Sequence, residues 1–217
     1  MTIASYMAAQ YLKNEELVVN FSSTEVSARW ARFVSNVISP PMVWAVMGFI
    51  IAVHSAKTQT DALVWALTYS VPVCLLPILY IAWEVRRGNI GDIHMKERHE
   101  RTRPFLVSII CTALAWVLLR LMGTPDILPL VAGVTMLQLT AMAVITLVWQ
   151  ISMHAMSISV AVVATGVVFG PATALAVFPL VPIVGAARLK LHRHTLAQVI
   201  AGAAIGALIP LVVLAIQ

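Results

Sequence analysis

Three groups of polar residues interrupt an otherwise apolar chain, and each combines residue types that bind or transfer a phosphate group. They are Lys96 with Arg103-Pro104, then Ser152 with His154, and finally Arg188 with His194 and Gln198. A phosphate ester carries two or three negative charges, so a site beside lipid needs cations with fixed donor geometry. Histidine exchanges protons near neutral pH and can attack phosphorus. If the three groups meet, we expect an anion site with the chemistry of phosphoryl transfer.

The expected phosphate-binding cations are Lys96, Arg103 and Arg188. The planar guanidinium group suits bidentate contact with phosphate and stays charged at any working pH, so the two arginines are the expected clamps. The other arginines nearby are interpreted as interfacial side chains whose charges reach water. These are Arg98, Arg101 and Arg193.

Both histidines are expected at the beginning of a helix. Ser152 and His154 precede an apolar run, where free backbone N–H groups and a partial positive charge favour an anion. His194 and Gln198 open the last run, and positions i and i+4 share a helical face. The Gln198 carbonyl is therefore expected to accept from one ring nitrogen of His194, which leaves the other nitrogen with a lone pair for attack.

The elements that position these residues are membrane helices. The chain is 60% hydrophobic with 11% charged residues, which is too little polar surface for a soluble globule. Its 217 residues hold about six to seven spans in an all-α polytopic bundle. Apolar runs fall at 38–54, 62–83, 105–122, 127–149, 155–169, 172–187 and 196–216, the fifth and sixth being short. Gly170-Pro171 and Gly123-Thr-Pro-Asp126 predict turns between runs.

Two regions are expected along the chain. Residues 1–35 read as an amphipathic, interfacial N-terminal segment without the pattern of a signal peptide. Residues 36–217 read as the membrane-embedded domain that holds the candidate site. Cys74 and Cys111 lie inside apolar runs and are interpreted as small core residues.

Counting the runs places all three polar groups on one side of the membrane, because an even number of crossings precedes each group. Of the 14 Lys and Arg residues, all but Lys57 and Arg120 lie on that side. The positive-inside rule makes this side cytoplasmic, which favours an inner or plasma membrane location with the site facing the cytoplasm.

The order and spacing of the three groups resemble the signature of the type-2 phosphatidic acid phosphatase and vanadium haloperoxidase superfamily. That signature reads Lys-x6-Arg-Pro, Pro-Ser-Gly-His and Ser-Arg-x5-His-x3-Asp. The first part is complete here, from Lys96 to Pro104. The departures lie in the second and third parts, where Ile151 replaces Pro, Met153 replaces Gly, Ala187 replaces Ser and Gln198 replaces Asp.

The resemblance implies a lipid phosphate phosphatase that works without a cofactor or a metal. It implies His194 as the nucleophile that forms a phosphohistidine, His154 as the general acid, and Gln198 in the place of the orienting carboxylate. It further implies phosphate binding by Lys96, Ser152, Arg103 and Arg188. The expected partners are membrane lipids and a prenyl phosphate, prenyl diphosphate or phosphatidic-acid-like substrate, and no nucleic acid.

Two other functions stay open at this point. The chain could be a phospholipid-headgroup binder whose catalysis was lost through Gln198 and Met153. It could also be a small transporter with broken spans, although the two halves show no repeat of motif or hydropathy. A metal site at Asp92, His94 and His99 is disfavoured by the like charge of neighbouring cations. Neither the lipid tail, the headgroup nor the oligomeric state follows from the sequence.

Overall fold

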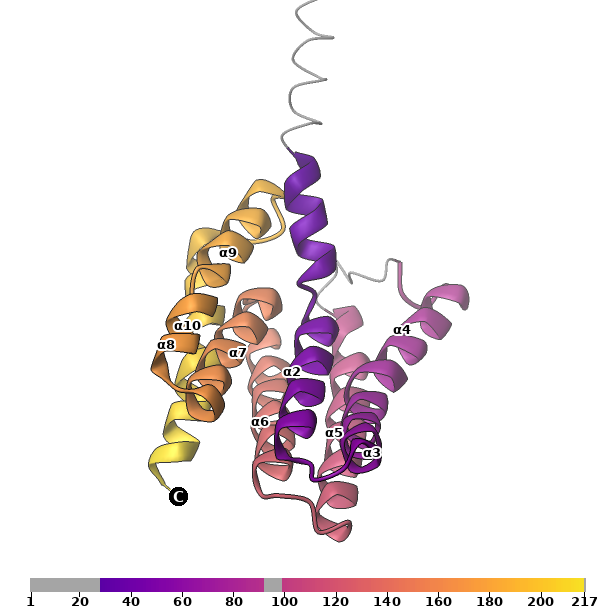
Figure 1. Cartoon of the computed structure of the whole chain (residues 1–217). Coiled ribbons are helices and arrows are strands. Elements are labelled where there is room, and N and C mark those ends of the chain that lie inside the picture. The colour runs from indigo at the N-terminus through magenta and orange to yellow at the C-terminus, as the bar shows by residue number, and fades with distance from the viewer. Residues whose placement is uncertain (1–27, 92–98, 217) are drawn as a thin grey trace, which may run out of the picture.

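The computed structural model describes residues 28–91 and 99–216, and within these ranges the chain is a bundle of helices without strands (Figure 1). The helices, in chain order, are Ala28–Val37, α2 (Pro40–Ser55), α3 (Gln59–Ser70), the π-helical turn Val71–Leu75, α4 (Leu76–Arg86), the 3₁₀ turn His99–Arg101, α5 (Thr102–Leu121), α6 (Ile127–Thr146), α7 (Met153–Phe169), α8 (Pro171–Val177), α9 (Leu180–Lys190) and α10 (Leu196–Ala215). The predicted all-α fold is confirmed.

Five of these helical stretches are long and apolar enough to cross a membrane. They are Gln59–Arg86, α5, α6, Pro171–Lys190 and α10. A sixth span arises if Ala28–Val37 and α2, which meet at a bend of 45°, count as one. Helix α7 is apolar but has only 17 residues. The chain is therefore a polytopic helical membrane protein, as its composition predicts.

The two predicted turns agree with the structure, whereas the predicted domain boundary falls within a helix. Gly170 separates α7 from α8 with φ of 90°, and Gly123 lies between α5 and α6 with φ of 65°, a conformation that favours glycine. Both predicted turns are confirmed. The predicted boundary between residues 35 and 36 falls inside the helix Ala28–Val37, and residues 1–27 lie outside the described residues.

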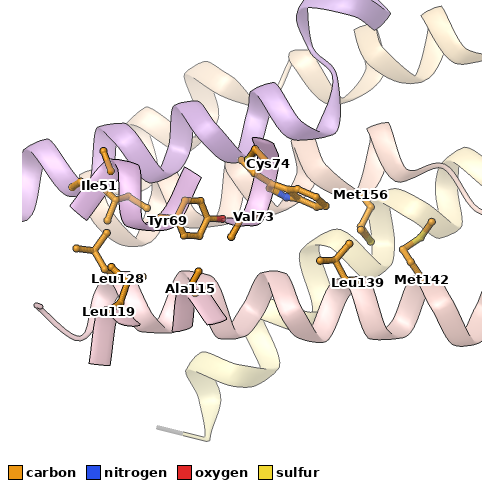
Figure 2. Packing of buried hydrophobic residues seen from close by; sticks show 14 of the residues in the cluster. Ile51, Tyr69, Val73, Cys74, Ala115, Leu119, Leu128, Leu139, Met142 and Met156 are labelled. Atoms are coloured by element: carbon orange, nitrogen blue, oxygen red, sulfur yellow. The ribbon is translucent and has the colours of Figure 1, made fainter. Parts of the chain in front are cut away.

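A buried apolar core joins α2, α3, α5, α6 and α7 (Figure 2). Tyr69 lies fully buried at its centre, packs over Gly48 of α2, and shares a hydrogen bond of 3.1 Å with the Thr135 hydroxyl of α6. A methyl group at Gly48 would overlap the Tyr69 ring, so glycine lets these two helices approach closely. Packing in this core thereby sets the positions of α2, α3, α5, α6 and α7 relative to one another.

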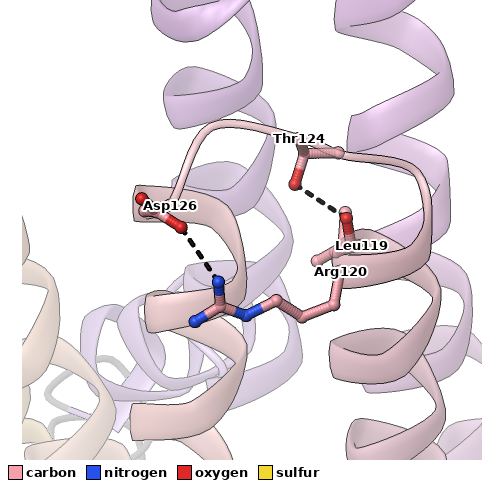
Figure 3. A network of polar contacts seen from close by, with 4 residues as sticks. All are labelled: Leu119, Arg120, Thr124 and Asp126. Atoms are coloured by element: carbon pink, nitrogen blue, oxygen red, sulfur yellow. Dashed lines mark hydrogen bonds and ion pairs between the residues drawn. The ribbon is translucent and has the colours of Figure 1, made fainter.

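The loop between α5 and α6 lies at one end of the bundle (Figure 1), and Figure 3 shows its polar contacts. Arg120 and Asp126 form an ion pair of 2.9 Å, and the Thr124 hydroxyl donates to the Leu119 carbonyl over 3.1 Å. Both charged side chains of the pair are largely exposed. The opposite end, where α5, α7 and α10 begin and α9 ends, carries the second and third polar groups and Arg103 of the first (Figure 1).

Candidate functional site

The second and third polar groups are joined by direct backbone contact between α7 and α10. Gly202 faces Ser152 and Gly206 faces Met156 so closely that a methyl group at either glycine would overlap a backbone carbonyl oxygen. This approach lets the Ser152 N–H donate a hydrogen bond of 3.0 Å to the Gln198 carbonyl oxygen. The contact holds the beginnings of the two helices at a fixed distance.

Ser152 caps α7 and is fully buried. Its hydroxyl oxygen accepts from the Ala155 N–H over 3.3 Å, which satisfies one of the unpaired donors of the first helical turn. The prediction that the helix begins beside Ser152 and His154 is confirmed. Met153, which stands where the family signature has glycine, is partly buried and packs against the apolar core.

A capping box at the beginning of α10 orients Gln198. The Thr195 hydroxyl accepts from the Gln198 N–H over 3.4 Å, and the Thr195 N–H donates to Gln198 Oε1 over 3.0 Å. Because an N–H group can only donate, the Gln198 atom that it meets is the carbonyl oxygen. Orientation of the amide is thus set by the backbone.

The predicted contact between Gln198 and His194 is present, with 3.3 Å between Gln198 Oε1 and His194 Nδ1. Since the amide oxygen accepts, Nδ1 of His194 must carry the proton, and Nε2 keeps its lone pair. This is the tautomer that a histidine nucleophile requires.

His194 stays neutral over a wide pH range. Burial, together with the guanidinium groups of Arg188, Arg101 and Arg193, lowers its pKa from the ordinary 6.5 to about 4, although the hydrogen bond to Gln198 acts in the opposite direction. A neutral imidazole next to three cations can offer its lone pair at neutral pH. An anion bound among those cations would offset their repulsion of one another.

Arg188 supplies the buried cation of the site. It lies near the end of α9 with only 7% of its surface exposed. Nη1 donates to the Ser35 hydroxyl over 3.2 Å, whereas Nε is buried and has no hydrogen-bond partner among the described residues. A buried guanidinium N–H without an acceptor destabilises the folded protein. A bound anion that accepts its hydrogen bond would remove this destabilisation.

Ser35 is a contact residue that the sequence reasoning did not identify. Its carbonyl oxygen lies 3.1 Å from Nε2 of His154, and its hydroxyl contacts Arg188. Ser35 therefore connects the helix Ala28–Val37 to both α7 and α9. It belongs to none of the three sequence groups, and only the tertiary contact reveals it.

The arginines around the site differ from those expected. Arg101 and Arg193, interpreted from the sequence as interfacial, act electrostatically on both His194 and Arg188. Burial lowers the pKa of Arg101, with neighbouring Glu100 acting in the opposite direction. Arg103, an expected clamp, has an exposed side chain on the first turn of α5. Arg101 and Arg193, which were expected to be interfacial, thus act on Arg188 through their charges.

Lys96 lies outside the described residues, as do Asp92 and His94 of the alternative metal site. Five of the predicted site residues lie at one end of the bundle, where the contacts above involve each of them: Ser152, His154, Arg188, His194 and Gln198. The second and third groups thus lie at the same end of the bundle, as expected if they share one side of the membrane, and Arg101, two residues before Arg103, acts electrostatically on His194.

Comparison with known proteins leaves the site to be interpreted from its own geometry. No protein-family model matches the chain, and neither the curated proteins nor the solved structures contain a significant match.

Proposed function

We propose that the chain is a membrane-integral phosphatase that hydrolyses a phosphate monoester or diphosphate of a lipid, and that it belongs to the type-2 phosphatidic acid phosphatase superfamily. The observation that carries the proposal is the pairing of a neutral, oriented His194 with a buried Arg188 whose Nε has no acceptor among the described residues. The first offers a nucleophile, and the second attracts the anion to be attacked.

The reaction would proceed in two displacements. The Nε2 lone pair of His194 attacks phosphorus, an N–P bond forms, and the bond from phosphorus to the leaving oxygen breaks while His154 gives that oxygen a proton. Water then attacks phosphorus, His154 accepts a proton from it, and the N–P bond breaks to release inorganic phosphate. Arg188, Arg101 and Arg193 stabilise the charge on the equatorial oxygens in both transition states.

The proton transfers ascribed to His154 are constrained by Ser35. A carbonyl oxygen only accepts, so Nε2 of His154 carries the proton in its 3.1 Å contact with Ser35. While that contact lasts, Nδ1 is the ring nitrogen that would exchange the catalytic proton. The contact would also stabilise the imidazolium form that donates to the leaving oxygen.

The proposed substrate is amphipathic. The site lies at the end of a bundle of membrane-spanning helices, so a headgroup phosphate could reach the arginines while its tail stays among the apolar helices. Prenyl phosphates, prenyl diphosphates and phosphatidic-acid-like lipids all have this form. From the distribution of Lys and Arg, we place the site at the cytoplasmic face of an inner or plasma membrane.

A second candidate is a phospholipid-headgroup binder without turnover. The observation that favours it is Gln198 itself, because a neutral amide orients His194 but does not stabilise the imidazolium that forms during attack. The anion site would then remain while hydrolysis was lost.

Purified protein assayed for phosphate release from a panel of lipid phosphates, with chelator present, separates the two candidates. We expect release from at least one prenyl or glycerolipid phosphate and its loss in His194→Ala. His192→Ala is the matched control, because His192 is an exposed histidine of the same loop. Binding of lipid phosphates without any release would favour the headgroup binder.

A further inference from the structure

Ser35 contacts two site residues from a helix that carries none of the sequence groups. It lies in Ala28–Val37 and is only 6% exposed. Its two oxygen atoms serve different partners, with the hydroxyl bound to Arg188 of α9 and the carbonyl to His154 of α7. The partners lie 153 and 119 residues away along the chain, so the contacts depend on the assembled bundle.

The carbonyl contact uses the end of a helix. Ala28–Val37 ends two residues after Ser35, so the Ser35 carbonyl is among the last four, which have no partner within a helix. The break before α2, where the chain bends by 45°, leaves this carbonyl at the edge of the site. His154 satisfies it and is thereby held in one ring orientation.

The hydroxyl contact restricts the orientation of the guanidinium group of Arg188. The group is planar and rigid, so holding Nη1 on the Ser35 oxygen also limits the directions of the remaining N–H groups. Among them is Nε, which is buried and lacks an acceptor in the described part of the chain. A phosphate oxygen placed against this edge would find donors that are already oriented.

We infer that Ser35 is a positioning residue of the anion site, which orients Arg188 through its hydroxyl group and His154 through its carbonyl group. The inference rests on the proposed phosphate chemistry of the same site. It extends the site to the helix Ala28–Val37, which the three sequence groups do not include.

The full-length protein in detergent is tested with inorganic phosphate and pyrophosphate as probes, by titration calorimetry, beside phosphate release from the lipid panel. The variants are Ser35→Ala, which removes the hydroxyl, and Ser35→Thr, which keeps it. Ser39→Ala is the matched control, because Ser39 precedes α2 and its side chain makes no capping hydrogen bond. Thermal unfolding of each variant is recorded in parallel.

We expect Ser35→Ala to bind phosphate about tenfold more weakly and to raise KM more than it lowers kcat, as loss of one charge-assisted hydrogen bond to the binding cation requires. Ser35→Thr should restore affinity, and Ser39→Ala should match the wild type. Unchanged phosphate affinity in Ser35→Ala, with or without lower thermal stability, would overturn the inference. Ser35-dependent binding of phosphate by a protein that releases none from any lipid would uphold it and remove the proposed phosphatase activity.

Discussion

The backbone N–H of Ser152 donates a hydrogen bond of 3.0 Å to the backbone carbonyl of Gln198, and this contact ties the beginning of α7 to the first turn of α10. Gln198 thereby has two functions in the site. Its backbone holds the helix that carries His154, while its side chain orients His194. The relative position of the two histidines consequently depends on how closely α7 and α10 pack.

Gly202→Ala tests this dependence. A methyl group there would overlap the Ser152 carbonyl, which belongs to the backbone and cannot rotate away. We expect a loss of roughly 1–3 kcal/mol in the free energy of unfolding, together with weaker phosphate binding, because the helices must separate.

Gly133→Ala provides the control for that change. A methyl group at Gly133 would meet the Trp116 ring at 3.7 Å, which is an ordinary contact. Thermal unfolding in detergent should leave this variant close to the wild type. Equal melting temperatures of the Gly133 and Gly202 variants would mean that the close approach of α7 and α10 does not contribute to stability.

Arg188→Met should change binding and stability in opposite directions. Replacing a buried cation that is surrounded by other cations with an apolar side chain of similar length relieves repulsion and desolvation, so we expect the thermal stability without phosphate to rise. Phosphate affinity should fall at least about tenfold, because the central donor is lost.

Arg120→Met is the matched change at the far end of the bundle, where Arg120 is exposed and paired with Asp126 (Figure 3). Titration with inorganic phosphate should give the wild-type affinity for this variant. If instead both arginine variants bound phosphate like the wild type, Arg188 would not belong to an anion site.

The pH dependence follows from the lowered pKa of His194. The neutral imidazole is the reactive form, so kcat/KM should rise as pH increases through about 4. Near neutral pH the imidazole is already neutral, so titration of His194 should no longer change kcat/KM. Arg193→Ala removes one repelling cation and should move this inflection to higher pH. A pH–rate profile with its His194-dependent inflection at the ordinary 6.5 in both proteins would contradict the electrostatic account.

The same pKa has a consequence for stability. Below about pH 6.5 an unfolded chain protonates His194, whereas the folded protein resists protonation until about pH 4. The contribution of neutral His194 to the free energy of unfolding is therefore fully present above pH 6.5 and is lost as pH falls toward 4. Thermal unfolding of the wild type and His194→Ala is compared between these pH values. As pH falls, the melting temperature should decrease less in the variant.

Gln198→Glu should strengthen the proposed chemistry. Glutamate keeps the length of the side chain and can still accept from Thr195 and His194, while its charge stabilises the imidazolium. We expect the His194 inflection to move to higher pH and turnover to rise roughly tenfold or more, in the direction opposite to the loss known for Asp→Asn in a triad. Gln198→Ala, which removes the acceptor, should lower turnover, and a lower rate in both variants would argue against this role.

Local patterns in the sequence account for much of this site. The apolar runs predict the helices, Gly170-Pro171 predicts the turn, and the spacing of His194 and Gln198 predicts their contact, because each depends on neighbours within a turn or two. Spacing alone could not show that the charge of Arg101 would act on Arg188. Arg101 ends the 3₁₀ turn before α5, and its electrostatic effect on Arg188 of α9 arises only in the assembled bundle.

Ser35 shows the same limit more clearly. It belongs to none of the three polar groups, and its importance arises from two contacts with residues more than 100 positions away. Such contacts depend on the 45° bend between Ala28–Val37 and α2, which no local pattern specifies. Residues that act through tertiary contacts are therefore the part of a site that sequence reasoning misses.

The most direct test of the central claim is to trap the covalent intermediate. Protein mixed with a lipid phosphate that it hydrolyses is quenched with base, which preserves phosphohistidine, and its peptides are analysed by mass spectrometry. We predict a phosphoryl group on His194 that is absent from His194→Ala and accumulates when His154 is replaced by Gln. Turnover of the same substrate without phosphorylation of His194, or with the phosphoryl group on another residue, would contradict the account.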